Sequence, residues 1–317
     1  MTGTEALQTG FKTGSRNLFA LAVQLAAEIA CACVAGLFIV VPVVMVLVLA
    51  LGRNLGDLTA NAEGARELFE SLRGAPVPAL AASVLFALAG VLMAYALTVF
   101  LRVGTLGMLR EDLVGGKPND LSAFFGAGRA YFGRGLAISL AGLPPSLVVV
   151  ALLLPLLMWF ARLRSAGDAG AMMLGIIVLA AAVLAAVFVL LLIWLWVFHA
   201  TAALVHADGT ISESLDASRR HVVQKAGPVA VVVLAFAGIG LLLACCCAPL
   251  TMIENKMSAS QGGLRAAGVF LMLARTTVEN VVFTAVGLYL SASLFVLFHA
   301  EHPVAVPQPE TPEPPAA

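Results

Sequence analysis

Charged and aromatic residues are scarce in this chain of 317 residues. Asp, Glu, Lys and Arg make up 11% of it, against about 25% in soluble domains, and their charges cancel to a net charge of zero. Phe, Trp and Tyr make up only 7%. A surface without excess positive charge does not attract phosphate backbones, and few aromatic rings leave little surface for base stacking. We therefore expect no nucleic-acid partner.

Cysteine is also scarce, and no cysteine is placed for chemistry. The five cysteines all lie inside apolar runs, at Cys31, Cys33, Cys245, Cys246 and Cys247. Adjacent residues of a helix point in different directions, so the three consecutive cysteines cannot surround one metal ion. We expect all five to act as small hydrophobic residues, without a disulfide framework.

Recognisable catalytic motifs are missing as well. The sequence contains no G-x-S-x-G, no H-E-x-x-H and no P-loop. His199, His206 and His299 have no closely spaced acid or cysteine that would complete a metal site, and we interpret them as residues favoured near helix C-termini. The sequence therefore predicts no metal, no cofactor and no enzymatic activity.

Apolar residues are what the chain has in excess, at 61%. A bilayer-crossing helix needs about 20 apolar residues, and backbone groups inside hydrocarbon must be satisfied within the helix. Residues 1–300 are therefore predicted to be one all-α, six-span helix bundle, followed by a disordered Pro-rich tail over 301–317. The six runs are Ile29–Leu51, Leu80–Leu101, Leu136–Phe160, Ala171–Phe198, Pro228–Met252 and Val281–Phe298.

An even number of spans places both termini on one side of the membrane. Slightly more of the 18 Lys and Arg residues lie on that side than on the other. The positive-inside rule therefore favours cytoplasmic termini.

Three segments that each precede a span share one pattern of larger and small residues. Positions i, i+4, i+7 and i+11 form one face of a helix, and the third of them is small in each segment. The segments begin after the candidate N-caps Thr4, Asp120 and Thr210, the last with Glu213 in a capping box. The predicted faces are Leu7, Phe11, Gly14 and Leu18; Leu121, Phe125, Gly128 and Phe132; and Ile211, Leu215, Ser218 and Val222.

Three prolines in similar registers, Pro42, Pro155 and Pro249, add a second mark to this pattern. Each is predicted to kink its span, because proline removes one intrahelical hydrogen bond. The chain is thus predicted to contain three repeats, at about 7–120, 121–210 and 211–300. Each repeat would be an interfacial amphipathic helix followed by a helical hairpin, as in other membrane proteins with internal symmetry.

The stretch FHATAALVHADGTISESLDASRR, residues 198–220, resembles a signature of bacterial six-span membrane families of unknown function. These include the membrane domain found beside some glycerophosphodiester phosphodiesterases. The resemblance implies the six-span fold and a location in the bacterial cytoplasmic membrane. The catalytic domain of those phosphodiesterases has no counterpart in this sequence, so the resemblance does not imply their activity.

Basic residues on the predicted amphipathic helices are the candidate contacts to lipid headgroups. Arg16, Arg129, Arg219 and Arg220 can anchor the helices among anionic headgroups, or they can grip a phosphate as a selective site. The sequence leaves both interpretations open. Glu28 and Arg102, near the same end of two antiparallel spans, are the candidates for a buried ion pair.

Three functions remain open at this point. The first is a non-enzymatic membrane protein that organises membrane lipids or other membrane proteins as its partners. The second is a transporter of a lipid or small apolar solute, which repeats and proline-broken helices favour. The third is a membrane-embedded enzyme, for which no set of residues was found.

Overall fold

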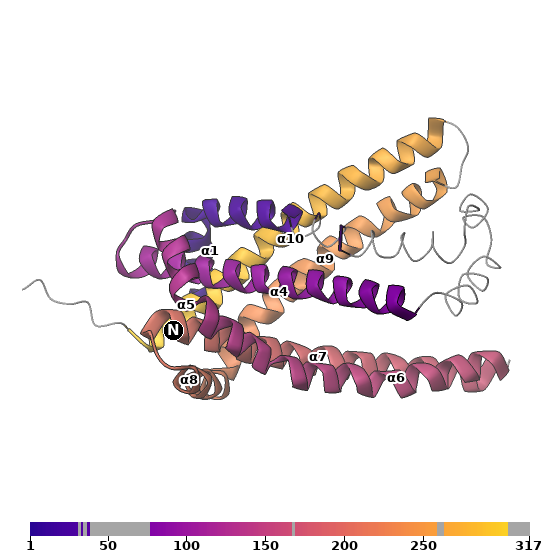
Figure 1. Cartoon of the computed structure of the whole chain (residues 1–317), viewed down its shortest axis with the longest axis horizontal. Coiled ribbons are helices and arrows are strands. Elements are labelled where there is room, and N and C mark those ends of the chain that lie inside the picture. The colour runs from indigo at the N-terminus through magenta and orange to yellow at the C-terminus, as the bar shows by residue number, and fades with distance from the viewer. Residues whose placement is uncertain (31–32, 34–36, 39–76, 167–168, 259–262, 304–317) are drawn as a thin grey trace, which may run out of the picture. The chain divides into compact units, whose positions relative to one another are not determined.

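The structure is a computed structural model that describes residues 1–30, 33, 37–38, 77–166, 169–258 and 263–303. Within these residues the chain is helical and contains no strand, which confirms the predicted all-α class. A further apolar helix, Leu18–Ala30, follows α1. The labelled helices are α1 (Gly3–Arg16), α4 (Val77–Val114), α5 (Leu121–Ala141), α6 (Leu143–Ala166), α7 (Ala169–Ala207), α8 (Ile211–Gln224), α9 (Ala226–Ser258) and α10 (Gly263–Glu301) (Figure 1).

Five helical segments are long and apolar enough to cross a membrane, so the protein is a multi-pass membrane protein. They correspond to the second to sixth predicted spans, and most of the first, Ile29–Leu51, lies outside the described residues. The five segments are Ala81–Val114, Leu121–Leu163, Gly170–Ala207, Ala226–Glu254 and Ala267–Glu301.

Two of the predicted spans differ in detail from the structure. The span Leu136–Phe160 is divided between α5 and α6, which meet at Gly142. Pro144 and Pro145 lack N–H donors, and they are tolerated there because they fall in the first turn of α6. The last span begins well before Val281, since α10 starts at Gly263 and its apolar segment at Ala267.

The described part of the chain forms two compact units, Ala22–Leu101 and a larger one made of Met1–Leu21 with Arg102–Ala317. Within the smaller unit, the rings of Phe38 and Phe86 stack with centroids 4.4 Å apart. Phe38 also lies against Gly90, where a Cβ atom would come within 2.3 Å of the Phe38 Cβ. The predicted single domain over 1–300 stays a prediction.

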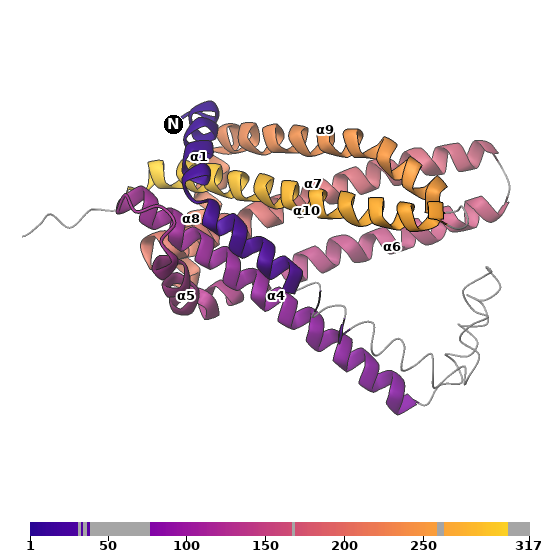
Figure 2. The ribbon, with the colours of Figure 1, turned by 90° about the horizontal axis from the view of Figure 1, so that it is seen from above.

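The larger unit combines a densely packed region with two apolar hairpins, α6–α7 and α9–α10 (Figures 1 and 2). We call the packed region the head. The head consists of α1, residues 102–114 of α4, α5, α8, and the C-terminal ends of α7 (195–207) and α10 (284–301). Its largest fully buried side chains include Phe124, Phe198, Phe295 and Phe298.

Large apolar side chains on the hairpins stay exposed away from the head. Leu152 of α6, Leu184 of α7 and Phe270 of α10 are each at least two-thirds exposed. Water does not tolerate so large an apolar surface, whereas hydrocarbon does. These parts of the hairpins are therefore the lipid-facing parts of the unit.

Prolines interrupt the hydrogen-bonding pattern of two hairpin helices, as the sequence predicts. Pro155 lies inside α6 and Pro249 inside α9. Figure 2 shows α9 changing direction in its second half, which is the half that holds Pro249. The third predicted kink, at Pro42, lies outside the described residues.

The helices α1, α5 and α8 each begin with a side-chain N-cap, and we call them the capped helices. Thr2 and Thr210 form full capping boxes with Glu5 and Glu213, and the Asp120 carboxylate accepts from two backbone N–H groups of α5. These hydrogen bonds lower the pKa of both Glu5 and Glu213. The boxes at Thr210 and the cap at Asp120 are as predicted.

The predicted start of α1 is wrong by two residues, because its cap is Thr2 and not Thr4. The buried face is also one residue earlier, with Ala6, Gly10 and Thr13 in place of Leu7 and Phe11, although Gly14 of the predicted face is buried. The two faces have the same spacing along the helix, so spacing alone does not distinguish them.

Removing the hydroxyl of Thr210 tests whether the capping box holds α8 in place. Thr210→Ala is expected to lower the free energy of unfolding by about 1 kcal/mol, because the Glu213 N–H loses its acceptor. Reversible unfolding in mixed micelles measures the change. Thr210→Ser is the matched control, since it keeps the hydroxyl, and an equal loss in both variants would contradict the capping role.

Candidate functional site

Each capped helix crosses one long helix of the head at close range. Gly10 of α1 lies so near α10 that an added Cβ would come within 2.4 Å of the Ser293 Cα. Gly107 of α4 meets Ala127 of α5 in the same way, with 2.2 Å between the two Cβ positions. On the α8 side, the Ser218 hydroxyl donates to the Trp196 carbonyl of α7 at 2.6 Å. Small residues therefore set all three crossings.

The apolar face of α8, which the sequence predicts to be an interfacial amphipathic helix, packs on other helices of the head. Ile211 and Leu215 lie against a buried cluster of Ile138, Val197, Ala200 and Leu204 from α5 and α7. An amphipathic helix buries its apolar face wherever the nearest apolar surface lies, and here α7 provides it. The predicted face of α5 is wrong at its first two positions, because Phe124 is buried whereas Leu121 and Phe125 are exposed, but its third position, Gly128, is buried.

An ion pair joins each capped helix, or the residue directly after it, to the C-terminal end of α4, α7 or α10. Arg16 pairs with Asp112 of α4 at 2.9 Å, and Arg134 of α5 pairs with Asp208 after α7 at 2.8 Å. In the third pair, Lys225 directly after α8 meets Glu301 of α10 at 2.9 Å. Since each pair links segments far apart in sequence, none of the three was predicted.

Of the four predicted headgroup contacts, Arg16 forms an ion pair within the protein. Its guanidinium is paired with Asp112, so its role in the structure is to join α1 to α4. Arg129 on α5 and both Arg219 and Arg220 on α8 are exposed. These three side chains remain the candidates for contact with lipid.

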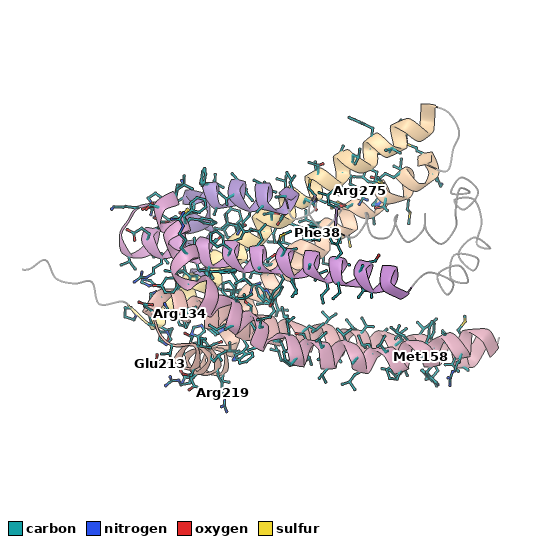
Figure 3. All side chains as sticks on the ribbon, in the orientation of Figure 1. Phe38, Arg134, Met158, Glu213, Arg219 and Arg275 are labelled. Atoms are coloured by element: carbon teal, nitrogen blue, oxygen red, sulfur yellow. The ribbon has the colours of Figure 1, made fainter. Side chains whose placement is uncertain are left out.

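A shallow hollow on the exposed side of α8 brings two of these arginines together. It is lined by Asp216, Arg219, Arg220, Val223 and Gln224, which we call the α8 basic face. Arg220 Nε donates to the Asp216 carbonyl at 3.4 Å, and Val223 is 73% exposed beside it. Figure 3 shows the Arg219 side chain extending away from the ribbon. Two cations beside one exposed apolar side chain suit the boundary between headgroups and acyl chains.

The predicted pair of Glu28 and Arg102 involves one residue of each unit. Glu28 lies at an exposed position of the helix Leu18–Ala30, and Arg102 is half-buried in α4. The pairing itself stays a prediction.

All five histidines of the chain gather in the head, around the ends of α7 and α10 and the buried side of α8. The ring centroids of His199 and His221 are 4.8 Å apart, and those of His206 and His299 are 5.0 Å apart. The fifth ring, His302, lies 6.0 Å from His221. The seven-residue spacing of His199 and His206, which puts both on one helix face, was the signal available in the sequence.

The imidazoles of this cluster stack on one another and on phenylalanine rings. The ring of His302 stacks on that of Phe298, which His206 and His221 also contact. Among the described residues, no group of three or more His, Cys, Asp or Glu side chains is arranged to hold a metal ion.

A second polar network lies on the α9–α10 hairpin, away from the head. Arg275 donates to Glu254 at 2.6 Å and to Glu279, its i+4 neighbour on α10, at 2.7 Å (Figure 3). Glu254 comes from α9 and is almost fully buried, and it was not singled out from the sequence. Two carboxylates on one guanidinium satisfy the polar groups that would otherwise face an apolar environment.

Comparison with known proteins finds no relative of this chain. No family model matches the chain, and neither a curated protein nor a solved structure matches it. The predicted similarity to the membrane domain beside glycerophosphodiester phosphodiesterases stays a prediction. What the protein does must therefore be inferred from the geometry of its own residues.

Proposed function

We propose that this protein is a non-enzymatic membrane protein that binds phosphate-bearing lipid headgroups and thereby organises lipids or partner proteins. The α8 basic face is the proposed site, with Arg129 as an additional contact. The observation that carries the proposal is the hollow in which Arg219 and Arg220 lie side by side on an exposed helix face. We place the protein in the bacterial cytoplasmic membrane, with both termini on the cytoplasmic side.

The position of α8 along the chain supports this site. It connects the span that ends at Ala207 to the span that begins at Ala226, so it follows the point where one helix leaves the apolar layer. Headgroup phosphates lie at that depth. Guanidinium groups bind phosphate oxygens through forked hydrogen bonds, and each basic residue near an anionic leaflet contributes about 1 kcal/mol.

The ion pairs and crossings also support three repeats closed into a ring. Each capped helix crosses one long helix and is ion-paired to another, which together involve α4, α7 and α10. If α1, α5 and α8 are equivalent, α5 and α8 each cross the long helix of the repeat before them, α4 and α7. Since α1 of the first repeat crosses α10 of the last repeat, the three repeats form a closed ring. The buried positions Ala6, Phe124 and Ser214 then correspond, and each lies four residues after an N-cap.

Neutralising the two arginines of the α8 basic face tests the proposed site. Arg219→Gln combined with Arg220→Gln is expected to weaken retention of anionic phospholipid by about 30-fold, which corresponds to about 1 kcal/mol for each charge. The measurement is native mass spectrometry of protein released from native-lipid discs, titrated with phosphatidylglycerol or phosphatidylcholine. Adding Arg129→Gln should weaken retention further.

The matched control removes two charges far from α8. Arg162→Gln combined with Lys256→Gln changes exposed residues on the hairpins and is expected to leave phosphatidylglycerol retention unchanged. Retention lost equally in both double variants, or unchanged in both, would show that the α8 basic face binds no headgroup. Partner proteins would then be the remaining candidates for what this face contacts.

A further inference from the structure

The rings of the histidine cluster are deeply buried and short of hydrogen-bond partners. His199, His206 and His221 are each at most 2% exposed. Within the described residues, four buried ring nitrogens have no hydrogen-bond partner: His199 Nε2, His206 Nδ1, His221 Nε2 and His299 Nδ1. A neutral imidazole tolerates an unpaired acceptor nitrogen in an apolar site far better than an imidazolium tolerates an unpaired N–H. The geometry therefore fits neutral rings.

The charged groups around the cluster are nearly balanced and already paired. His221 is faced by His199 from α7, by Glu301 and His302 from the end of α10, and by Lys225 at the end of α8. Glu301, the only carboxylate in that set, is bound to Lys225.

The surroundings of His206 are positive. His206 is faced by Arg110 from α4 and by His299 and His302 from the end of α10, and its Nε2 donates to the His302 carbonyl. Of the other elements beside α8, α5 uses Arg134 on Asp208, and α9 has its charged residues at its far end. A proton added to the cluster thus meets no free carboxylate among these groups.

We propose that the five histidines form a proton-operated latch, which fastens α8 to the ends of α7 and α10 when neutral and releases α8 when protonated. Mildly acidic pH is expected to release α8. It is independent of the lipid site proposed above, because it concerns how α8 is attached and not what α8 binds.

Electrostatics gives the direction of the response. Burial, together with the neighbouring His199 and His302, lowers the pKa of His221 from about 6.5 to about 3. A released α8 exposes His221 to water, where its pKa returns to the ordinary value of about 6.5. The released state therefore binds more protons below that pH, so docking is fully stable above about pH 6.5 and weakens as the pH falls towards 3.

Histidine is the side chain whose ordinary pKa falls between pH 5 and 8, and every histidine of this chain lies in the cluster. A conformational response in that range therefore reports on the latch. A single histidine that titrates only in the released state raises the population of that state about tenfold between pH 7.5 and pH 5.5.

Hydrogen–deuterium exchange of the full chain in lipid discs of pure phosphatidylcholine tests the latch. After correction for the intrinsic pH dependence of exchange, peptides covering α8 are expected to exchange at least about tenfold faster at pH 5.5 than at pH 7.5. The capped helix α1 is an internal control, because it has the same length and capping box and contains no histidine. Its exchange is expected to change little.

Two variants assign the response to the cluster. His221→Gln and His302→Gln each replace a titratable imidazole with a side chain that stays neutral at every pH. The pH response of α8 is expected to be smaller than in the wild type in both variants. An α8 response equal to that of α1, or a response that persists in His221→Gln, would overturn the proposal. If His221→Gln does not fold, the comparison of α8 with α1 in the wild type and in His302→Gln still decides the matter.

Discussion

Replacing Gly107 with alanine is expected to lower the free energy of unfolding of the head by about 2 kcal/mol. The added Cβ would lie 2.2 Å from the Ala127 Cβ and 3.0 Å from the Ala123 carbonyl oxygen, both on α5. These neighbours are a helix backbone and a methyl group, neither of which can rotate away. The two helices must therefore move apart, and the contacts around Phe124 loosen with them. Reversible unfolding in mixed micelles measures the loss.

The crossing offers a compensating change, because the nearest obstacle is the Ala127 methyl group. Gly107→Ala combined with Ala127→Gly moves that methyl from one helix to the other and is expected to recover most of the loss. Gly133→Ala is the matched control, since a Cβ there meets no atom within 4 Å. Alanine at that helical site is expected to stabilise by about 0.5–1 kcal/mol. An equal loss in Gly133→Ala would mean that the loss in Gly107→Ala does not come from the crossing, and no recovery in the double variant would mean that the Ala127 methyl group is not its cause.

Features that depend on neighbouring residues could be predicted from the sequence. The capping box of Thr210 and Glu213 needs only three residues of spacing, and the apolar segments need only composition over about 20 residues. The all-α class follows from these, because an apolar backbone in lipid has to satisfy its own hydrogen bonds.

Features that depend on which helices meet could not be predicted. Whether Leu121 or Phe124 of α5 is buried depends on where α4 lies, and periodicity is the same for both. The predicted face of α1 was one residue late for the same reason, since Leu7 and Ala6 are both acceptable core residues. The structure decides in favour of Ala6 because α1 approaches α10 too closely for a larger side chain at Gly10.

The polar groups of the head were missed because their partners are distant in sequence. Asn17 Nδ2 donates to Asp112 Oδ2, which lies 95 residues further along. His206 and His302 are in contact although 96 residues separate them. Lys225 directly precedes α9 and Glu301 ends α10, so the whole α9–α10 hairpin separates this pair along the chain. Each of these residues alone suggests a solvated helix end. Only the fold shows that they form joints within the head.

Among these joints, the one at Asp112 is expected to contribute most to stability. The Asp112 side chain is 1% exposed, and its two oxygens have different partners: Oδ2 accepts a hydrogen bond from Asn17 Nδ2 at 2.8 Å, and Oδ1 lies 2.9 Å from Arg16 Nη2 in an ion pair without hydrogen-bond geometry. An asparagine at this position has one oxygen and one amide nitrogen, so one of the two donors faces another donor. Asp112→Asn is therefore expected to cost about 2 kcal/mol in the free energy of unfolding, from one buried donor left unpaired and a lost charge. Arg16 remains half in solvent, which keeps the cost below the roughly 3–5 kcal/mol typical of fully buried pairs.

The equivalent change at Asp208 separates this effect from a general loss of charge. Asp208 is 65% exposed and binds Arg134 through one oxygen, which an asparagine would keep. Its backbone has a positive φ of 51°, a conformation that asparagine adopts readily. Asp208→Asn is thus expected to cost less than about 0.5 kcal/mol, as exposed ion pairs do. Equal losses at the two positions in the same unfolding experiment would mean that charge, and not the burial of Asp112 between Arg16 and Asn17, stabilises the head. A larger loss at Asp112 would instead identify the α1–α4 joint as the more stabilising of the two.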